Sequence, residues 1–411
     1  MLTLADTMQT FMRDDSLVIV DARGHRRLIG DEARPPTATV HLHSRLTDLS
    51  IALRPGLAFG EAYMSGALTI EGGTVYDVLA VIAKNFSHLP RLSWINVASR
   101  LSGRIKQKNP ILVAKKNVAH HYDLSPALYD LFLDSDRQYS CAYFANPSDS
   151  LETAQANKKR HIASKLLLDR PNLSVLDIGS GWGGLGLYLA NETGARVTGL
   201  TLSEEQFRGS NDRSAREGLS NRVDFALRDY RDETGRYDRI VSVGMFEHVG
   251  KANYPEFFAK MGELLADDGV ALLHSCGFSD PPGSINPFIR KYIFPGADQP
   301  SMSEVFAVVE RSGLVVTDVE ILHLHYAETL RCWRERFVAR WDEAARLYDE
   351  RFCRMWECYL AMCEVGFRYL TSIVFQMQLT HRKGVVPITR DYMVQAERRL
   401  AVDDVRAVAA D

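Results

Sequence analysis

Residues 174–190 read SVLDIGSGWGGLGLYLA, and the architecture expected for the rest of the chain follows from them. An apolar run around Asp177 is followed by closely spaced glycines and then by apolar residues at helical spacing, an order that predicts a strand, a tight turn and a helix. Gly179, Gly181 and Gly184 stand in G-x-G-x-x-G order, which lets the backbone approach a nucleotide closely. The glycines alone do not name that nucleotide.

The residues after this turn repeat the alternation of strand and helix. Strands interrupted by helices predict an α/β fold with a doubly wound, mostly parallel sheet of the Rossmann-like kind. The strand-like runs are ARVTGLT at 195–201, RVDFAL at 222–227, YDRIVSV at 237–243 and GVALLHSCG at 269–277, with the helix YPEFFAKMGELL at 254–265.

The choice of cofactor depends on where the acidic residues lie. A dinucleotide needs a carboxylate on its ribose about 20 residues after the glycines, but the strand ending at Thr201 offers carboxylates only at Glu204 and Glu205. Asp177 lies at the tip of the first strand, as in S-adenosylmethionine-dependent methyltransferases, whose ligand carries a sulfonium and an ammonium and no phosphate. A carboxylate suits such a cation better than an anion-binding helix end does. A glycine turn that only packs helix on strand is the alternative.

Length, composition, charge and cysteine spacing limit the classes to which the protein can belong. The 411 residues are 46% hydrophobic and 25% charged, typical of a globular protein of two domains, and the net charge of -3 implies no general attraction to nucleic acid. The first 15 residues lack a signal-peptide pattern and no window approaches 18 apolar residues, so we expect a cytoplasmic chain without a membrane span. Six scattered cysteines without a C-x₂-C pair predict reduced thiols and no metal site.

Changes in composition and in the spacing of apolar residues divide the sequence into two expected domains and a linker. Residues 1–100 contain the strand-like runs LVIV at 17–20 and TVHLH at 39–43 and a helix expected over 74–84, and predict a small α/β domain whose apolar residues form a lipid-facing surface or an ordinary core. The polar, basic stretch before Pro110 predicts a linker over 101–115, which leaves 116–411 as the larger domain.

Two later segments carry further expectations. Residues 278–304 are rich in proline and glycine and predict a long loop or lid. Residues 328–378 have apolar side chains at helical spacing, which predicts long helices that cap the sheet or meet a second subunit, with core packing favoured.

Nine motifs, taken together and in order from about Asn117 to Phe337, resemble the cyclopropane-fatty-acyl-phospholipid synthase family. The N-terminal 100 residues resemble the longer bacterial members, whose first domain contacts lipid, though less specifically. The motifs are YDLSPALYDLFLD at 122–134, QYSCAYF at 138–144, VLDIGSGWGG at 175–184, TLSEEQ at 201–206, DYRD at 229–232, DRIVSVGMFEHVG at 238–250, LLHSCG at 272–277, IRKYIFPG at 289–296 and HYAETLRCWRERF at 325–337.

The resemblance implies a reaction in which the methyl group of S-adenosylmethionine is transferred to a cis double bond of a phospholipid acyl chain. A proton must then leave the new methyl group before a cyclopropane ring can close. Family members use bound bicarbonate as the base. The resemblance assigns its coordination to Cys141, Glu247, His274 and Tyr326, with the backbone amide of Cys276 assisting.

Each of these residues also has an ordinary explanation. A lone buried cysteine usually packs, a histidine on a strand usually satisfies a local hydrogen bond, and Glu247 could cap the following helix. For the cofactor, the resemblance implies contacts from Tyr139, Ser140, Asp177, Gly179, Gly181, the segment from Thr201 to Gln206, and Asp229 and Tyr230, where the adenine would lie.

The implied partners are unsaturated phospholipids at the inner face of a membrane, with peripheral attachment, and a second copy of the chain in a homodimer. Arg290 and Lys291, among apolar lid residues, suit an anionic lipid surface. Three other functions stay open: a lipid methyltransferase that leaves methyl-branched or methylene chains, a nicotinamide-dependent dehydrogenase, and a non-catalytic lipid carrier.

Overall fold

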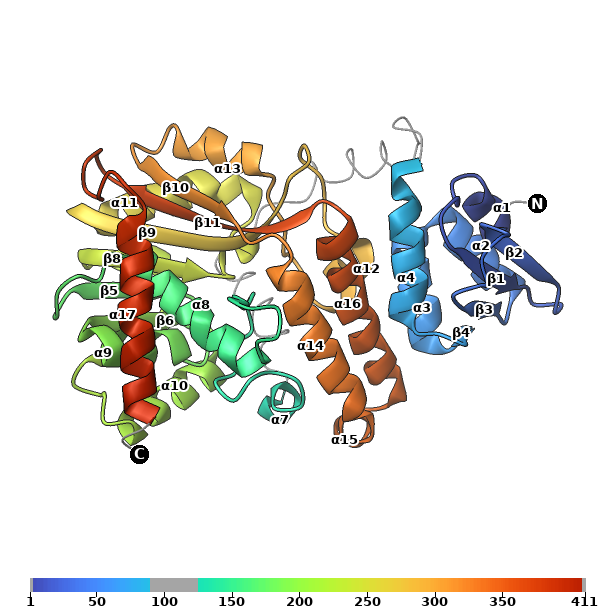
Figure 1. The fold of residues 1–411 in the computed structure, drawn as a ribbon, viewed down its shortest axis with the longest axis horizontal. Helices are drawn as coiled ribbons and strands as arrows, with labels where there is room; N and C mark the ends of the chain where they lie inside the picture. Colours follow the sequence, from blue (N-terminus) through green and yellow to red (C-terminus); the bar gives the residue numbers. More distant parts are fainter. Residues whose placement is uncertain (1–2, 89–124, 409–411) are drawn as a thin grey trace.

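A computed structural model describes residues 3–88 and 125–408 of the chain (Figure 1). They form two sheets, one of four strands near the N-terminus and one of seven strands in the larger part. The linker predicted over 101–115 lies outside the described residues.

The large sheet has the order β10-β11-β9-β8-β5-β6-β7. Neighbouring strands from β7 to β9 are parallel, whereas β11 is antiparallel to both β9 and β10. The predicted α/β fold with a mostly parallel sheet is therefore confirmed. The strands are β5 (Ser174–Ile178), β6 (Arg196–Thr201), β7 (Val223–Leu227), β8 (Tyr237–Val243), β9 (Leu265–Phe278), β10 (Val315–Ile321) and β11 (Ser372–Thr380).

Helices cover both faces of this sheet, because alternate side chains of each strand point to opposite sides. On β5, Val175 packs with α8, α9 and α17, while Leu176 and Ile178 pack with α11 and α13. The bounds are α8 (Leu151–Lys165), α9 (Gly184–Thr193), α10 (Glu204–Arg216), α11 (Tyr254–Leu264), α13 (Met302–Val309) and α17 (Asp391–Val408).

The N-terminal residues form a four-stranded sheet of order β2-β1-β3-β4 with helices packed beside it. Thr74 and Asp77 form a reciprocal capping box at the start of α4, which explains the helix that was predicted there. The elements are α1 (Leu4–Gln9), β1 (Ser16–Val20), β2 (Arg26–Gly30), β3 (Thr39–Leu42), α2 (Arg45–Leu53), α3 (Pro55–Ser65), β4 (Leu68–Glu71) and α4 (Val75–Lys84).

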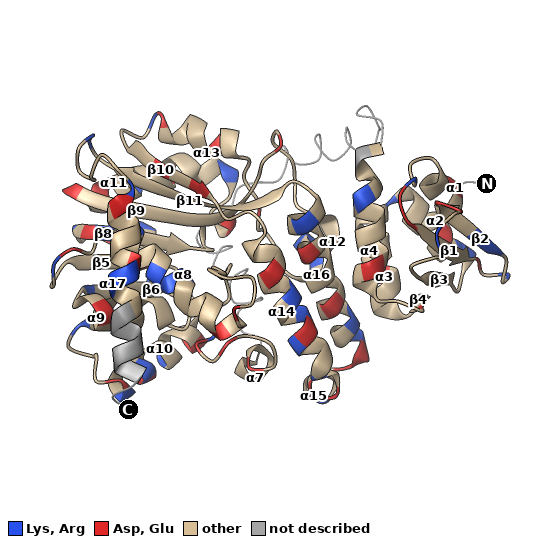
Figure 2. Ribbon diagram, in the orientation of Figure 1, with Lys and Arg blue, Asp and Glu red and all other residues tan. Residues whose placement is uncertain are grey.

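The C-terminal helices α14 (His325–Ala339), α15 (Trp341–Leu347) and α16 (Glu350–Tyr369) lie between the large sheet and the N-terminal unit (Figure 1). Their apolar side chains share one core with α3 and α4, as the favoured core packing predicts. The helical prediction fails beyond Tyr369, since residues 372–380 form β11. Charges of both signs follow α14 and α16 (Figure 2) and pair across them, as between Arg334 and Glu364 at 2.9 Å.

The lid segment contains a short helix, α12 (Pro287–Tyr292), that packs against α3. Phe288 is fully buried there, and Lys291 and Tyr292 both bond Glu61, at 2.6 and 2.8 Å. The carboxylate of Glu61 therefore offsets the Lys291 charge that was predicted to face anionic lipid.

Alanine at position 60 is expected to loosen this contact, because a Cβ atom on Gly60 would lie 2.4 Å from the Phe288 ring. Overpacking of this kind costs about 1–3 kcal/mol. Urea unfolding of Gly60→Ala should show that loss. Gly283→Ala is the control, because its nearest neighbour would be 4.0 Å away. Equal stability of the two variants would contradict the packing.

Candidate active site

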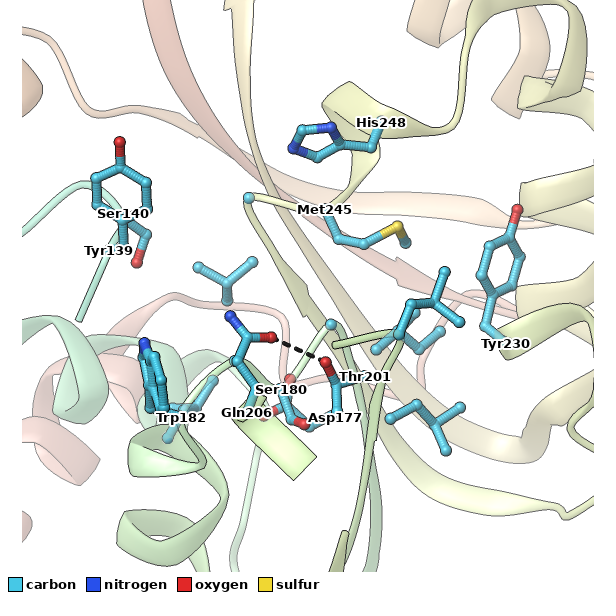
Figure 3. Close-up of a pocket in the computed structure, with 18 of the residues that line it drawn as sticks. Tyr139, Ser140, Asp177, Ser180, Trp182, Thr201, Gln206, Tyr230, Met245 and His248 are labelled. Carbon is cyan, nitrogen blue, oxygen red and sulfur yellow. Dashed lines mark hydrogen bonds between the residues drawn. The ribbon is translucent and has the colours of Figure 1, made fainter. Parts of the chain in front are cut away.

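A pocket opens where the carboxyl ends of β5, β6 and β8 meet, the usual ligand position in such sheets (Figure 3). It is lined by nine residues that the resemblance assigned to the cofactor: Tyr139, Ser140, Asp177, Gly179, Gly181, Thr201, Gln206, Asp229 and Tyr230. Within the assigned segment from Thr201 to Gln206, residues 203–205 do not line it. Trp182, Met245 and His248 also line it and were not predicted.

The glycine turn needs its glycines for two reasons. Gly179 and Gly181 have φ of 86° and 55°, a region that other residues rarely adopt. A Cβ atom on Gly179 would also lie 2.8 Å from Met245, whereas one on Gly181 would meet nothing within 4 Å. The turn is thus closed on one side and open beside the pocket, where a ligand can approach the backbone.

Asp177 supplies the negative charge of the pocket. Its side chain is buried, and burial raises its pKa to about 7, against the opposing effect of Lys158. Asp177 Oδ2 and Ser180 Oγ are buried and lack a hydrogen-bond partner among the described residues. Two such acceptor atoms beside an open glycine turn fit the ammonium of an amino-acid ligand.

Lys158 on α8 is a functional candidate that the sequence did not reveal. Its ammonium is buried and donates to Gln138 Oε1 at 2.5 Å and to Ser140 Oγ at 2.8 Å. Burial lowers its pKa to about 8. Because NKKRH at 157–161 has the pattern of an exposed helical face, only tertiary contacts identify Lys158 as a pocket cation.

Thr201 and Gln206 act as a pair. The Thr201 hydroxyl donates to Gln206 Oε1 at 2.8 Å, the bond drawn in Figure 3, and accepts from the Ser203 amide at 3.2 Å. The carbonyl oxygen of the Gln206 side chain therefore already accepts a hydrogen bond, and its NH₂ group can donate to a ligand. This geometry makes Thr201 the residue that orients Gln206.

Asp229 and Tyr230 line the far wall beyond β7. Arg231 holds both oxygens of Asp229, at 2.9 and 2.7 Å, so that carboxylate is neutralised by an ion pair. Tyr230 is buried beside Phe257 and offers an apolar ring to the pocket.

The five residues assigned to bicarbonate do not line this pocket, although Cys141 and Glu247 are next in sequence to residues that do. Cys141 comes after Ser140, and the Gly244 amide donates to the His274 carbonyl at 2.9 Å. Cys141, Cys276 and Tyr326 belong to one buried cluster, and the Cys276 and Cys141 thiols add to the effect of burial in raising the pKa of Tyr326. Glu247 is joined to Cys276 by the hydrogen bond from its backbone amide, and His274 lies two residues before Cys276 on the same face of β9.

Glu247, in the turn after β8, is the acidic member of this cluster. Its Oε1 accepts from the Cys276 amide at 2.6 Å, while Oε2 is buried with no partner in the described part of the chain. Burial raises its pKa. The Cys276 amide, expected to reach bicarbonate, is therefore bonded to Glu247 here.

The remaining members are neutral groups. Burial raises the pKa values of the Cys141 thiol and the Tyr326 phenol, and it lowers that of His274 well below the ordinary range. Cys141 Sγ donates to the Ala142 carbonyl at 3.3 Å, and the six cysteines are free thiols. A neutral thiol, phenol and imidazole beside a carboxyl group suit an oxyanion that also carries a hydroxyl hydrogen.

Within residues 3–88 and 125–408, no group of three or more His, Cys, Asp or Glu side chains is placed to hold a metal ion. No helix in these ranges is both long and apolar enough to cross a membrane.

The sheet order, the glycine turn and the orphaned acceptors define an S-adenosylmethionine-dependent methyltransferase. The family model described as mycolic acid cyclopropane synthetase matches residues 112–377. The chain belongs to this family.

Known relatives agree with that assignment. The cyclopropane-fatty-acyl-phospholipid synthase of Escherichia coli K12 is 39% identical over 76% of this chain and 80% of its own length. A probable fatty acid methyltransferase of Pseudomonas putida is 42% identical, over 61% of this chain and 65% of that protein. A crystal structure of a mycolic acid cyclopropane synthase with SAH and CTAB shares 33% identity and a TM-score of 0.61, covering 64% of this chain and 97% of that one.

Proposed function

We propose that this protein converts cis double bonds of unsaturated phospholipid acyl chains into cyclopropane rings, with S-adenosylmethionine as donor and bicarbonate as base. The proposal rests on the buried Oε2 of Glu247, which has no hydrogen-bond partner among the described residues, and on the neutral side chains of Cys141, His274 and Tyr326, which the resemblance assigns to the same site. Methyl transfer to an alkene leaves a carbocation that must lose a proton before a ring can close, and a held base next to such an acceptor serves that step.

The chain's own residues would hold the donor by its amino-acid end. Asp177 and Ser180 would accept from the ammonium, Lys158 would face the carboxylate, and the Gln206 amide would bond the ribose. S-Adenosylmethionine supplies an electrophilic methyl group when bound. An alkene is a weak nucleophile, so the apolar surroundings of the site serve to exclude water and align the chain.

Ring closure requires removal of a proton from the added methyl group. Cys141, His274 and Tyr326 would donate to the oxygens of bicarbonate, and Glu247 Oε2 would accept its hydroxyl hydrogen. Two anions in a dry cavity repel each other, but the raised pKa of Glu247 lessens that repulsion. The held anion also stabilises positive charge that develops on the acyl chain.

The test is incubation with ¹³C-methyl-labelled S-adenosylmethionine and vesicles of unsaturated phosphatidylglycerol. Proton NMR of the extracted lipid should show labelled cyclopropane signals at high field. Absence of label in the lipid would refute lipid modification, and label only in methyl or methylene groups would refute ring closure.

Transfer without ring closure is the second candidate. It is favoured by the similarity to a protein named as a probable fatty acid methyltransferase. Methylene and cyclopropane chains are isomers of equal mass, so the NMR spectrum decides between them where a mass measurement does not.

Membrane contact is proposed for one face of α2. Leu46, Leu49 and Leu53 lie three and four residues apart and are exposed by 77, 39 and 48%, with exposed Arg45 and Arg54 at the two ends of the row. Apolar side chains flanked by cations suit the surface of an anionic bilayer at the inner face of a membrane.

Changing both Leu46 and Leu49 to glutamine is expected to weaken binding to anionic vesicles about tenfold. Full burial of one leucine side chain contributes about 1.5–3 kcal/mol of free energy, and partial burial at an interface contributes less. Vesicle co-sedimentation measures this. Leu347→Gln on α15 is the control, because Leu347 is also exposed but belongs to another surface. Equal binding by all three proteins would exclude α2 as the contact.

A further inference from the structure

A chain of buried polar side chains connects His274 on β9 with Gln376 on β11 and Lys165 on α8. Gln376 on β11 is directly opposite His274 in the β9–β11 pair, and its Nε2 lies 3.1 Å from His274 Nδ1. Lys165 Nζ donates to Gln376 Oε1 at 2.6 Å. Gln376 and Lys165 are each 1% exposed, so water does not compete for these bonds.

The chemistry of these groups fixes the direction of each bond. A lysine ammonium only donates, so the atom of Gln376 that faces Lys165 must be the carbonyl oxygen. The other end of the amide is then an NH₂ group, which donates to His274 Nδ1. A nitrogen that accepts carries no proton, so the single proton of the neutral imidazole is on Nε2.

Lys165 is itself held in place from two other elements. Glu320 on β10 forms an ion pair with Lys165 and accepts from His161 Nε2 at 2.8 Å. His161 Nδ1 also bonds Glu397 on α17. Against the effect of burial, the bonds from His161 and the charge of Lys165 lower the pKa of Glu320 to about 2, so its carboxylate stays ionised and opposes the lowering of the Lys165 pKa by burial.

We infer that Gln376 is a positioning residue that sets the tautomer of His274, with Lys165 fixing the orientation of the Gln376 amide. The imidazole is thereby held with Nε2–H as a donor for the bicarbonate site. This inference rests on the proposed function for the role of that donor, but the tautomer itself follows from the contacts alone.

Gln376→Glu should reverse the tautomer of His274 with little change in the shape of the side chain at position 376. A carboxylate only accepts, so His274 should move its proton to Nδ1, and Lys165 keeps an acceptor opposite it. The Nε2 donor is then lost. We expect kcat to fall about 10- to 100-fold, the effect that outer partners of functional histidines have in metal sites, while the KM for S-adenosylmethionine changes less than about twofold.

The decisive readout is ¹⁵N NMR of the full-length protein labelled at histidine, in which the two tautomers have distinct shifts. His274 is assigned by the signal that disappears in His274→Gln. The wild-type signal should be that of the Nε2–H tautomer, and the Gln376→Glu signal that of the Nδ1–H tautomer. An Nδ1–H signal in the wild type, or no change in Gln376→Glu, would overturn the inference.

Gln378→Glu is the matched control. Gln378 is on the same face of β11 and equally buried, and it donates to the Lys165 carbonyl at 2.6 Å and to Tyr392 at 2.8 Å without touching His274. The His274 signal of this variant should stay that of Nε2–H, whatever the effect of altered packing on kcat. A shifted signal would show a general disturbance and overturn the assignment.

Failure of the proposed function has a different signature. If His274→Gln retains full turnover, His274 has no part in the reaction, whatever the tautomer spectra show. If His274→Gln is inactive and Gln376→Glu changes the tautomer without lowering kcat, the donor role assigned to Nε2–H is wrong.

Discussion

Glutamine in place of Glu247 is expected to lower turnover by about three orders of magnitude, within the range that positioned acid–base groups contribute. The amide is isosteric, and its oxygen can still accept from the Cys276 amide as Glu247 Oε1 does at 2.6 Å. The NH₂ group would then occupy the position of Oε2 and meet the bicarbonate hydroxyl with a donor where an acceptor is needed. Transfer of label from S-adenosylmethionine to phospholipid measures the loss.

Affinity for S-adenosylmethionine should stay within about twofold in Glu247→Gln, because Glu247 lies behind the pocket and does not line it. Calorimetric titration checks this. Glu263→Gln, which removes an exposed carboxylate paired with Lys260 on α11, is the control and should behave as the wild type. Full turnover in Glu247→Gln would remove this residue from the mechanism.

Asparagine in place of Asp177 is expected to raise the dissociation constant for S-adenosylmethionine about 100-fold. Loss of a charged, buried hydrogen bond costs about 1.5–3 kcal/mol, and 1.36 kcal/mol corresponds to a factor of ten. Calorimetric titration measures both proteins. An unchanged constant would show that Asp177 does not hold the cationic end of the ligand.

The same residue gives the wild type a pH dependence. Because the pKa of Asp177 is raised to about 7, the carboxyl group is largely neutral below that pH and ionised above it. Affinity for the cationic ligand should therefore rise as the pH increases from about 6 to about 7.5, a window in which an ordinary aspartate would show no change. Asp177→Asn should be flat across this window, and a flat wild-type profile would contradict the assignment.

The sheet and the cofactor pocket could be predicted because contiguous residues encode them. A strand, a glycine turn and a helix within 174–190 fix the position of the first loop, and the parallel strands that follow bring Thr201 and Asp229 to the same edge. The motif residues assigned to the cofactor are accordingly found around one pocket.

The antiparallel end of the sheet could not be predicted in the same way. β11 is buried along most of its length on both faces, so SIVFQMQLT lacks the alternation that marks a half-buried strand, and it continues the apolar spacing of α16. Its pairing partners, β9 and β10, are distant in sequence. The local apolar spacing therefore predicted a helix over residues that form β11.

Three buried polar residues could not be recognised from the sequence either. Lys158, Lys165 and Gln376 belong to residue types that are mostly exposed, and nothing in their local sequence marks them as interior. Their roles come from contacts with partners up to 211 residues away, such as the bond from Lys165 to Gln376. Only the tertiary structure shows that Lys158 lines the cofactor pocket and that Gln376 and Lys165 form a hydrogen-bonded chain with His274.

The role of bicarbonate is tested most directly by following ring formation in buffer stripped of carbon dioxide and then supplied with bicarbonate again. The wild-type enzyme should form labelled cyclopropane chains slowly in the stripped buffer and recover on addition of bicarbonate, whereas Glu247→Gln should not recover. Ring formation at an equal rate with and without bicarbonate would contradict the proposed mechanism.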